Sequence, residues 1–304
     1  MSIKTIQFCE VGPRDGLQNV KDFVPTDIKI ELVRRCLQTG ERYMQITSFM
    51  NPKAVPQMRD AREVVEAILP DYPDVRFNAL VPNLRGAKDA WDCGLREVVS
   101  AFSLSETHNK ANINKTHEQS YAELERIRQA YPDMFLIFGI GTAFGCPWEG
   151  ETNVDQLMEA VHRGIAIGVN AIEIADPIGV AYPLQVERYI HAIRAEYPDL
   201  ELGVHMHDTR NMGIASTWAA IQCGATVIQG SVGGLGGCPF APGATGNIAT
   251  EDLVFLLDRS GVDSGIDYEK ILDVARFAER NVNGLFGSHQ LKVPQDTYPL
   301  CHCQ

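Results

Sequence analysis

Two histidines separated by one residue, His205 and His207, are the first candidates for chemistry in this sequence. They follow the apolar Leu202–Val204, at the predicted end of a buried strand. Side chains alternate across a strand, so both imidazoles point to one face while Met206 points away. Two imidazoles fixed on one face form half of a site for a divalent metal ion. The alternative is a pair of structural histidines hydrogen-bonded in the core, so the choice depends on the side chains beside them.

Length and composition narrow the class of protein. The chain has 304 residues, of which 45% are hydrophobic and 22% charged, and this is ordinary globular composition. No run reaches the roughly 18 apolar residues that a membrane span needs. Met1–Lys4 leads directly into a strand-like segment without a basic and then apolar leader, so we expect a cytoplasmic protein and no membrane partner. The net charge of −12 argues against a nucleic-acid surface but leaves an anionic small ligand open.

The eight cysteines are scattered along the chain, so a disulfide framework is not expected. Cys301 and Cys303 are the exception, because only one residue separates them. They could form a redox pair or bind a metal, but a frayed terminus is the simpler interpretation.

Hydrophobic periodicity predicts a regular alternation of strands and helices. The expected strands are Lys4–Val11, Tyr43–Thr47, Val75–Leu80, Glu97–Ser103, Phe135–Gly141, Ala171–Ala175, Leu202–His207 and Val227–Ser231. The expected helices are Thr26–Thr39, Gln57–Leu69, Leu84–Cys93, His117–Tyr131, Val154–Ile167, Pro183–Tyr197, Met212–Cys223, Thr250–Ser260 and Tyr268–Leu285. A polar loop is expected at Ser105–Asn114.

This alternation predicts an α/β protein with a parallel sheet, and eight units favour a closed (β/α)8 TIM barrel. An open doubly wound sheet is the alternative, but no Gly-x-Gly-x-x-Gly turn follows the first strand. No linker interrupts the chain, so we expect one domain over residues 1–304, with a C-terminal helical extension from about 262.

In such a barrel the catalytic groups lie where the strands end and the next loops begin. Polar side chains gather at those points in this sequence. They are Arg14 and Asp15 after strand one, Gln45 and Ser48 on strand two, Glu173 and Asp176 on strand six, and His205, His207 and Asp208 on strand seven. The glycine-rich segment Gly233–Asn247 follows strand eight and carries Cys238. Barrel closure places strand eight beside strand one, so these groups become neighbours.

The residue types predict a divalent cation site formed by Asp15, His205, His207 and Asn247. Imidazoles, a carboxylate and an amide oxygen with open water positions suit Mg²⁺ or Mn²⁺. The alternatives are that Asp15 caps a turn and that Asn247 caps the following helix. The surrounding Pro13–Gly16 favours a turn that directs both Arg14 and Asp15 inward.

Cys238 is the cysteine best placed for chemistry, since a thiol in a glycine-rich loop over the barrel mouth can act as an acid or nucleophile. The alternative interpretation is that Cys238 is a buried structural cysteine. Cys146 lacks so glycine-rich a loop and is interpreted as structural.

These motifs together resemble the 3-hydroxy-3-methylglutaryl-CoA lyase family over nearly the whole chain and in the same order. The matching segments are Val11–Asn19, Thr47–Phe49, Phe144–Gly150, His205–Thr209 and Gly234–Asn247. Isopropylmalate and citramalate synthases share Arg14–Gly16 but carry a glutamate where Leu17 stands, which favours the lyase branch.

The resemblance implies a metal-dependent retro-Claisen cleavage that releases acetyl-CoA and a keto acid. Asp15, His205, His207 and Asn247 would be the metal ligands, and Arg14 would stabilise the enolate oxygen of the departing thioester. Cys238 would donate the proton to the forming methyl carbon. Asp15 or His205 could be the base, but a water relay at the metal is preferred because a ligand is a poor base.

Three positions depart from the family pattern. Gln45 replaces a glutamate on strand two and can orient Arg14 but cannot accept a proton. Glu173 replaces a small serine on strand six, and we hypothesise that it partly restores the missing charge from the opposite side. Arg210 stands where the family has tyrosine and would contact a substrate carboxylate, unless it is a solvated arginine at a helix start.

These departures bear on the acyl group that is cleaved more than on the reaction. The leading hypothesis is cleavage of 3-hydroxy-3-methylglutaryl-CoA to acetyl-CoA and acetoacetate. A lyase for citramalyl-CoA or a longer-branched 3-hydroxyglutaryl-CoA, a Claisen-condensing synthase, and a non-catalytic acyl-CoA-binding barrel are alternatives. The CoA phosphates would meet basic groups after strands two to four, of which Lys53, Arg85, Lys110 and Lys115 are weak candidates. The resemblance also implies a homodimer.

Overall fold

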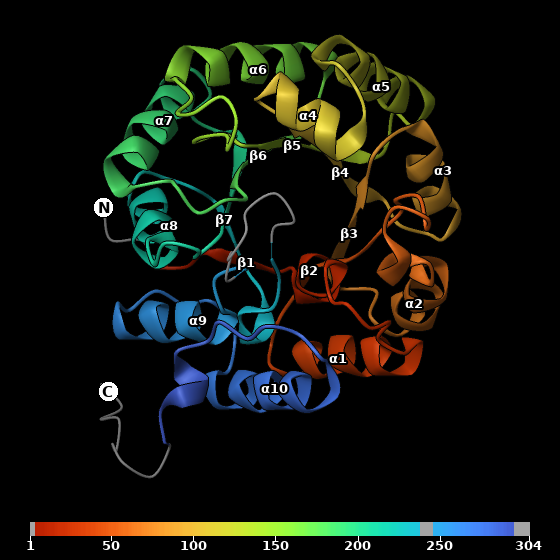
Figure 1. Cartoon of the computed structure of the whole chain (residues 1–304), viewed down its shortest axis with the longest axis vertical. Coiled ribbons are helices and arrows are strands. Elements are labelled where there is room, and N and C mark those ends of the chain that lie inside the picture. The colour runs from red at the N-terminus through yellow and green to blue at the C-terminus, as the bar shows by residue number, and fades with distance from the viewer. Residues whose placement is uncertain (1–3, 238–245, 295–304) are drawn as a thin grey trace.

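Eight parallel strands close into a barrel in the order β1-β2-β3-β4-β5-β6-β7-β8, as Figure 1 shows from one end. The structure is a computed structural model, and it describes residues 4–237 and 246–294. The strands are β1 Gln7–Glu10, β2 Tyr43–Ser48, β3 Arg76–Val81, β4 Glu97–Ser103, β5 Phe135–Gly141, β6 Ala171–Asp176, β7 Glu201–Met206 and β8 Val227–Gly230. The predicted (β/α)8 TIM barrel is confirmed.

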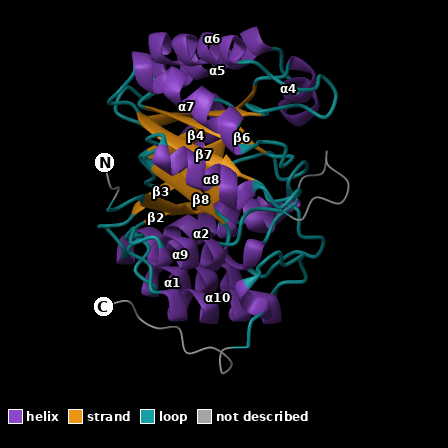
Figure 2. Cartoon of the chain, turned by 90° about the vertical axis from the view of Figure 1, so that its left-hand side faces the viewer, coloured by secondary structure: helices purple, strands orange, loops and turns teal. Residues whose placement is uncertain are grey.

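Helices surround the barrel because each connection between parallel strands must cross back over the outside of the sheet (Figures 1 and 2). They are α1 Thr26–Gln38, α2 Ala61–Ile68, α3 Leu84–Asp92, α4 Glu106–Ile113, α5 His117–Ala130, α6 Val154–Ile167, α7 Pro183–Glu196, α8 Gly213–Gln222, α9 Thr250–Arg259 and α10 Tyr268–Asn281. One large apolar core lies between the strands and these helices, with buried Leu32, Leu124, Ile172 and Leu253 among its members.

Barrel closure depends on the pairing of β1 with β8, in which Gln7 to Glu10 align with Val227 to Gly230. This pairing places the turn after β1 beside the segment after β8. Residues more than 200 positions apart in the sequence therefore share one end of the barrel, as predicted.

One segment differs from its predicted structure, and the first strand is shorter than predicted. That strand ends at Glu10, and the predicted turn after it is a π-helical turn over Gly12–Gly16. The expected loop at Ser105–Asn114 is instead the helix α4, which begins because the Ser105 hydroxyl accepts a hydrogen bond from the His108 amide. A hydroxyl cap can start a helix in a polar segment that has no apolar stripe.

Some helix boundaries also shift. Of the predicted helix Gln57–Leu69, the α-helical part begins at Ala61, because Pro56–Met58 forms a separate 3₁₀ turn. The other helix ends agree with prediction to within one or two residues, except that α10 ends at Asn281.

Beyond the barrel, α10 lies alongside α1 (Figure 1), where the Arg35 guanidinium carbon is 4.4 Å from the centre of the Phe277 ring. The predicted single domain with a helical extension stays a prediction. Among the described residues no helix combines the length and apolarity needed to cross a bilayer.

Candidate active site

The four predicted cation ligands meet at the C-terminal end of the barrel. His205 Nε2 lies 3.1 Å from His207 Nε2, and Asp15 Oδ2 lies 3.9 Å and 3.5 Å from these two nitrogens, respectively. Asn247 Nδ2 donates a hydrogen bond of 2.8 Å to the same Asp15 oxygen. All four residues are buried. Side chains from three distant parts of the sequence therefore converge on one point.

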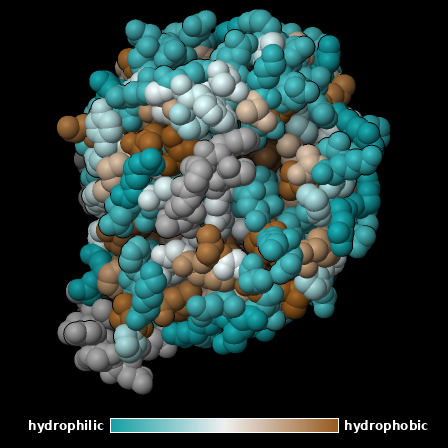
Figure 3. Space-filling view, in the orientation of Figure 1, coloured by the Kyte–Doolittle hydropathy of each residue, from teal (hydrophilic) through white to brown (hydrophobic). Residues whose placement is uncertain are grey.

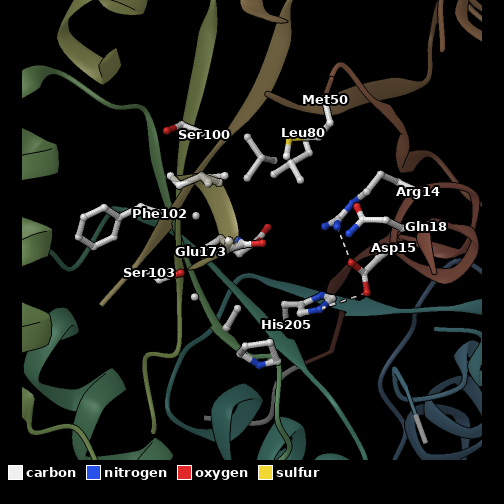
Figure 4. A pocket seen from close by; sticks show the side chains of 18 of the residues that line it. Arg14, Asp15, Gln18, Met50, Leu80, Ser100, Phe102, Ser103, Glu173 and His205 are labelled. Carbon is white, nitrogen blue, oxygen red and sulfur yellow. Dashed lines mark hydrogen bonds and ion pairs between the residues drawn. The ribbon is translucent and has the colours of Figure 1, made fainter. Parts of the chain in front are cut away.

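The π-helical turn Gly12–Gly16 delivers Asp15 to this point. The Val11 carbonyl accepts backbone hydrogen bonds from Arg14, Asp15 and Gly16, and this tightens the turn. Figure 4 shows the Arg14 and Asp15 side chains both directed toward the cavity. The inward aim of both residues was expected from the proline and glycine around them.

Asn247 is placed by the backbone. It forms an isolated antiparallel bridge with His207, and the Asp208 amide donates to the Gly246 carbonyl at 3.0 Å. A side chain at Gly236 would have no room, because its Cβ would lie 2.5 Å from Asn247 Nδ2 and the backbone φ there is +136°. Glycine at 236 therefore permits the close approach of Asn247.

The donor set fits a divalent cation. Ligand atoms of Asp15, His205 and His207 all lie within 4.8 Å of one another. Burial lowers the pKa of His205 to about 4, so its imidazole is neutral near pH 7, as a metal ligand must be. Burial alone would raise the pKa of Asp15, but the adjacent Arg14 guanidinium and the histidines hold it well below its usual range. Asn247 Oδ1 is buried without a hydrogen-bond partner among the described residues, so an acceptor is available for a cation.

Arg14 is held between two side chains. Its Nη1 donates to Asp15 and its Nε donates to the Gln45 side-chain oxygen. Gln45 Nε2 in turn donates to Asn78 Oδ1 at 3.0 Å, and Asn78 Nδ2 donates to Glu97 Oε1 at 3.1 Å. A buried hydrogen-bonded chain inside the barrel therefore fixes the guanidinium.

A cavity of about 160 Å³ opens beside these groups. Figure 4 shows Glu173 and Arg14 reaching into it from opposite sides, while the Phe102 ring points away toward the helices. Its polar lining comes from Arg14, Asp15, Gln18, Asn19, Ser100, Ser103, His108, Asn112, Glu173, His205 and His207. In the space-filling view this end of the molecule is hydrophilic at the rim, with apolar side chains nearer the centre (Figure 3).

Glu173 faces the cavity and not the helical layer. Burial raises its pKa to about 7, although Arg14 and a hydrogen bond from Gln229 oppose that rise. The carboxyl group that stands where the family pattern predicts a serine therefore lies within the electrostatic reach of Arg14.

The remaining predicted contacts lie outside the cavity lining. Ser48 is fully buried at the end of β2, and its hydroxyl has no partner in the part of the chain that the structure describes. Asp176 accepts a hydrogen bond of 2.7 Å from the Ala181 amide and organises the loop after β6. Arg210 is exposed and donates to the Ile178 carbonyl at 2.7 Å. Substrate contact by these three residues stays a prediction.

Cys238 lies outside the described residues, as do Cys301 and Cys303. Cys146 is buried and its thiol is 3.0 Å from the Ser105 hydroxyl at the start of α4, in keeping with a structural role.

Sequence reasoning missed several site residues. Helix α4 contributes His108, Asn112 and Ile113 to the cavity wall. These residues were missed because the segment was expected to be a loop. Gln229 was also missed, although a polar residue in the otherwise apolar strand β8 is a signal that could have singled it out.

A second group of potential ligands, Glu10, Cys36 and Glu41, is buried between β1 and α1. Glu10 accepts hydrogen bonds from the Gly12 and Val232 amides and from the Thr250 hydroxyl. Glu41 has no partner for either oxygen among the described residues, and burial together with Glu10 raises its pKa well above the usual value. Burial of this carboxyl group without a partner therefore favours its neutral form.

The HMGL-like family model matches residues 5–278. The chain belongs to the HMGL-like family.

Its relatives match along almost the whole chain. It is 38% identical over 292 residues to hydroxymethylglutaryl-CoA lyase YngG of Bacillus subtilis, covering 95% of this chain and 97% of the relative. It is also 38% identical to the human mitochondrial hydroxymethylglutaryl-CoA lyase, covering 98% of this chain and 91% of that protein.

Solved structures agree. The crystal structure of the B. subtilis HMG-CoA lyase superposes with a TM-score of 0.90 at 37% identity, covering 95% of this chain and 97% of that one. An Acinetobacter baumannii HMG-CoA lyase in complex with coenzyme A and 3-methylmalate gives a TM-score of 0.91 at 35% identity, covering 97% and 96%. The family resemblance predicted from the sequence is confirmed.

Proposed function

We propose that the protein is a carbon–carbon lyase that cleaves 3-hydroxy-3-methylglutaryl-CoA to acetyl-CoA and acetoacetate. The observation that carries this proposal is the convergence of Asp15, His205, His207 and Asn247 beside the Arg14 guanidinium in the cavity at the C-terminal end of the barrel. Relatives named hydroxymethylglutaryl-CoA lyase, which cover nearly the whole chain, support the same reaction.

Asp15, His205, His207 and the Asn247 amide oxygen would hold Mg²⁺ or Mn²⁺. A bound divalent cation supplies Lewis acidity that lowers the pKa of a coordinated hydroxyl group, as the 3-hydroxyl of the substrate requires. The neutral His205 imidazole and the ionised Asp15 are the protonation states that such a cation selects.

Arg14 would stabilise the departing acetyl thioester. Breaking the carbon–carbon bond places negative charge on the thioester oxygen as the enolate forms, and a fixed cation near that oxygen lowers the barrier. Because Asp15 and Gln45 hold the guanidinium in place, little reorganisation accompanies the reaction. Cys238 as the acid that protonates the new methyl carbon is an inference from the family motif.

Two observations bear on the acyl group of the substrate. The A. baumannii relative was solved with coenzyme A and 3-methylmalate, and this supports an acyl-CoA substrate here. Glu173 places a carboxyl group in the cavity that the family pattern lacks, so a related 3-hydroxyacyl-CoA such as citramalyl-CoA is the second candidate. A homodimer and a cytoplasmic location remain predictions from the sequence.

A coupled assay for acetyl-CoA tests the proposal. We expect release from 3-hydroxy-3-methylglutaryl-CoA that needs Mg²⁺ or Mn²⁺, stops after chelation and is lost in Arg14→Met and Cys238→Ala. Cys223→Ala is the matched control, because Cys223 follows α8 at the opposite end of the barrel. Release from citramalyl-CoA alone would change the substrate. No release from any 3-hydroxyacyl-CoA, with binding retained, would overturn the lyase in favour of an acyl-CoA-binding barrel.

A further inference from the structure

A chain of three buried side chains lies behind the predicted cation site. Gln229 on β8 donates a hydrogen bond from Nε2 to Glu173 Oε2 on β6, and its Oε1 lies 2.7 Å from His205 Nδ1 on β7. These three residues are buried at 4%, 7% and 6% exposure, respectively, so water does not compete for the contacts. Glu173 therefore reaches His205 through a single intervening amide.

The barrel has space built for this glutamate. Glu173 aligns with Gly139 on β5 and with Gly203 on β7, so neither neighbour in the register has a side chain. A Cβ added at Gly139 would lie 2.9 Å from Val99 Cγ1 and 3.9 Å from Glu173 Oε1, and one at Gly203 would lie 3.6 Å from Glu173 Cγ. The pair of glycines lets a long acidic side chain lie flat inside the barrel and contact Gln229.

The contacts determine which nitrogen of His205 carries the proton. An ionised carboxylate only accepts hydrogen bonds, so it turns the Gln229 NH₂ group toward itself and leaves the Gln229 oxygen facing His205. An oxygen acceptor there requires a proton on His205 Nδ1. The lone pair then lies on Nε2, the nitrogen that faces Asp15 Oδ2 at 3.9 Å and His207 Nε2 at 3.1 Å. A reversed amide would place the proton on Nε2 and block that lone pair.

We propose that Glu173 is a positioning residue that, through Gln229, holds His205 in the tautomer able to bind the divalent cation. This inference rests on the proposed role of His205 as a ligand, although the tautomer itself can be measured without any metal. Partners that orient a ligating histidine typically change metal affinity by about 10- to 100-fold. The chain thus achieves with a glutamate and a glutamine on different strands what a single carboxylate beside the imidazole can do.

The first measurement is the tautomer of His205 in the metal-free protein. Long-range ¹H–¹⁵N correlation spectra distinguish the two ring nitrogens, and pH 8.5 keeps Glu173 ionised. We expect the Nδ1–H form in the parent protein and a mixture of both forms in Glu173→Met, which removes the acceptor but keeps the side-chain length. An unchanged Nδ1–H form in Glu173→Met would overturn the proposal regardless of whether the protein is a lyase.

The second measurement is Mn²⁺ affinity, followed by titration calorimetry without substrate. Glu173→Met is expected to weaken binding by about 10- to 100-fold, and Glu173→Gln, which can still accept from Gln229, by less. The double variant Glu173→Met with Gln229→Glu places a carboxylate directly at His205 Nδ1 and is expected to restore both the tautomer and the affinity. A packing role for Glu173 would not be rescued this way.

Glu41→Met is the matched control, since it removes another buried carboxyl group that lies between β1 and α1. It is expected to leave the His205 tautomer unchanged. If Glu173→Met alters only the KM for acyl-CoA and leaves metal affinity intact, Glu173 contacts the acyl group and the positioning role is wrong. If the protein binds no Mn²⁺ but the tautomer of His205 still changes in Glu173→Met, the metal site is wrong and the hydrogen-bonded link from Glu173 through Gln229 to His205 stands.

Discussion

Arg14 donates its Nε hydrogen to the side-chain oxygen of Gln45, so a neutral amide takes the place of the glutamate expected on strand two from the family pattern. Gln45 also donates to Asn78, and both ends of its amide are therefore engaged. The consequence is a guanidinium whose orientation is fixed without a second carboxylate beside it. Its charge is balanced instead by Asp15 and, across the cavity, by Glu173.

The variant Gln45→Met tests whether Gln45 orients the Arg14 guanidinium or contributes to substrate binding. The change leaves Arg14 Nε without its acceptor and Asn78 Oδ1 without its donor, so the guanidinium loses its fixed position. We expect kcat to fall by about 100-fold with a much smaller change in KM, because misplacement affects mainly the transition state. Gln45→Glu keeps the acceptor and should stay within about 10-fold of the parent enzyme. Equal losses in both variants, measured by steady-state kinetics, would refute an orienting role.

Asn247 tests the fourth position of the cation site. Its unpartnered Oδ1 is the atom predicted to bind the metal, whereas Nδ2 already donates to Asp15 and to the Leu235 carbonyl. Asn247→Ala should weaken Mn²⁺ binding by about 10-fold or more, and Asn247→Asp should retain it because a carboxylate is an equally suitable ligand. Electron paramagnetic resonance of free Mn²⁺ measures both affinities. Unaltered affinity in Asn247→Ala would leave only three protein ligands.

The barrel was predictable because its signals are local. Each apolar strand and amphipathic helix carries its own periodicity, and the rule that catalytic groups follow the strands brought Asp15, His205, His207 and Asn247 together. Two features could not be predicted, for different reasons. Helix α4 has a local cap at Ser105 but no apolar stripe, so the hydrophobic pattern gives no sign of it. The link from Glu173 to His205 requires side chains from three strands in register, and no single window along the sequence contains that information.

Glu41 makes a prediction about stability and pH. The folded protein retains the Glu41 proton above pH 4.5, whereas the unfolded chain releases it, so its contribution to stability is lost as the pH rises. Glu41→Leu removes a buried polar group with no partner among the described residues, and we expect it to stabilise the protein by about 1–3 kcal/mol at pH 8. The gain should shrink toward pH 5, as measured by urea unfolding at each pH.

The control for this experiment is Glu63→Leu, which changes an exposed glutamate of α2 and should show no such pH dependence. If Glu10, Cys36 and Glu41 instead held a cation, Glu41→Leu would destabilise the protein. Metal analysis of the parent protein would then find a second equivalent, which Glu41→Leu would lose.

Helix α4 gives the last prediction, because it forms part of the cavity wall and depends on one cap. Ser105 accepts the His108 amide hydrogen at 3.1 Å, and α4 carries His108 and Asn112 into the cavity lining. Ser105→Ala should cost about 1 kcal/mol of helix stability and let the first turn of α4 fray. The KM for the acyl-CoA substrate should then rise several-fold while kcat stays nearly constant, since α4 contributes to the cavity wall and the described cation ligands Asp15, His205 and His207 lie on other elements. Hydrogen–deuterium exchange should be faster in the amides of α4 only.

Thr116→Ala is the control variant, because it removes the equivalent cap from α5. Thr116 accepts from the Gln119 amide at 3.2 Å, and the described residues that line the cavity include none from α5. A similar loss of stability without a change in KM is expected there. If both variants raise KM equally, general destabilisation and not the wall formed by α4 controls substrate affinity.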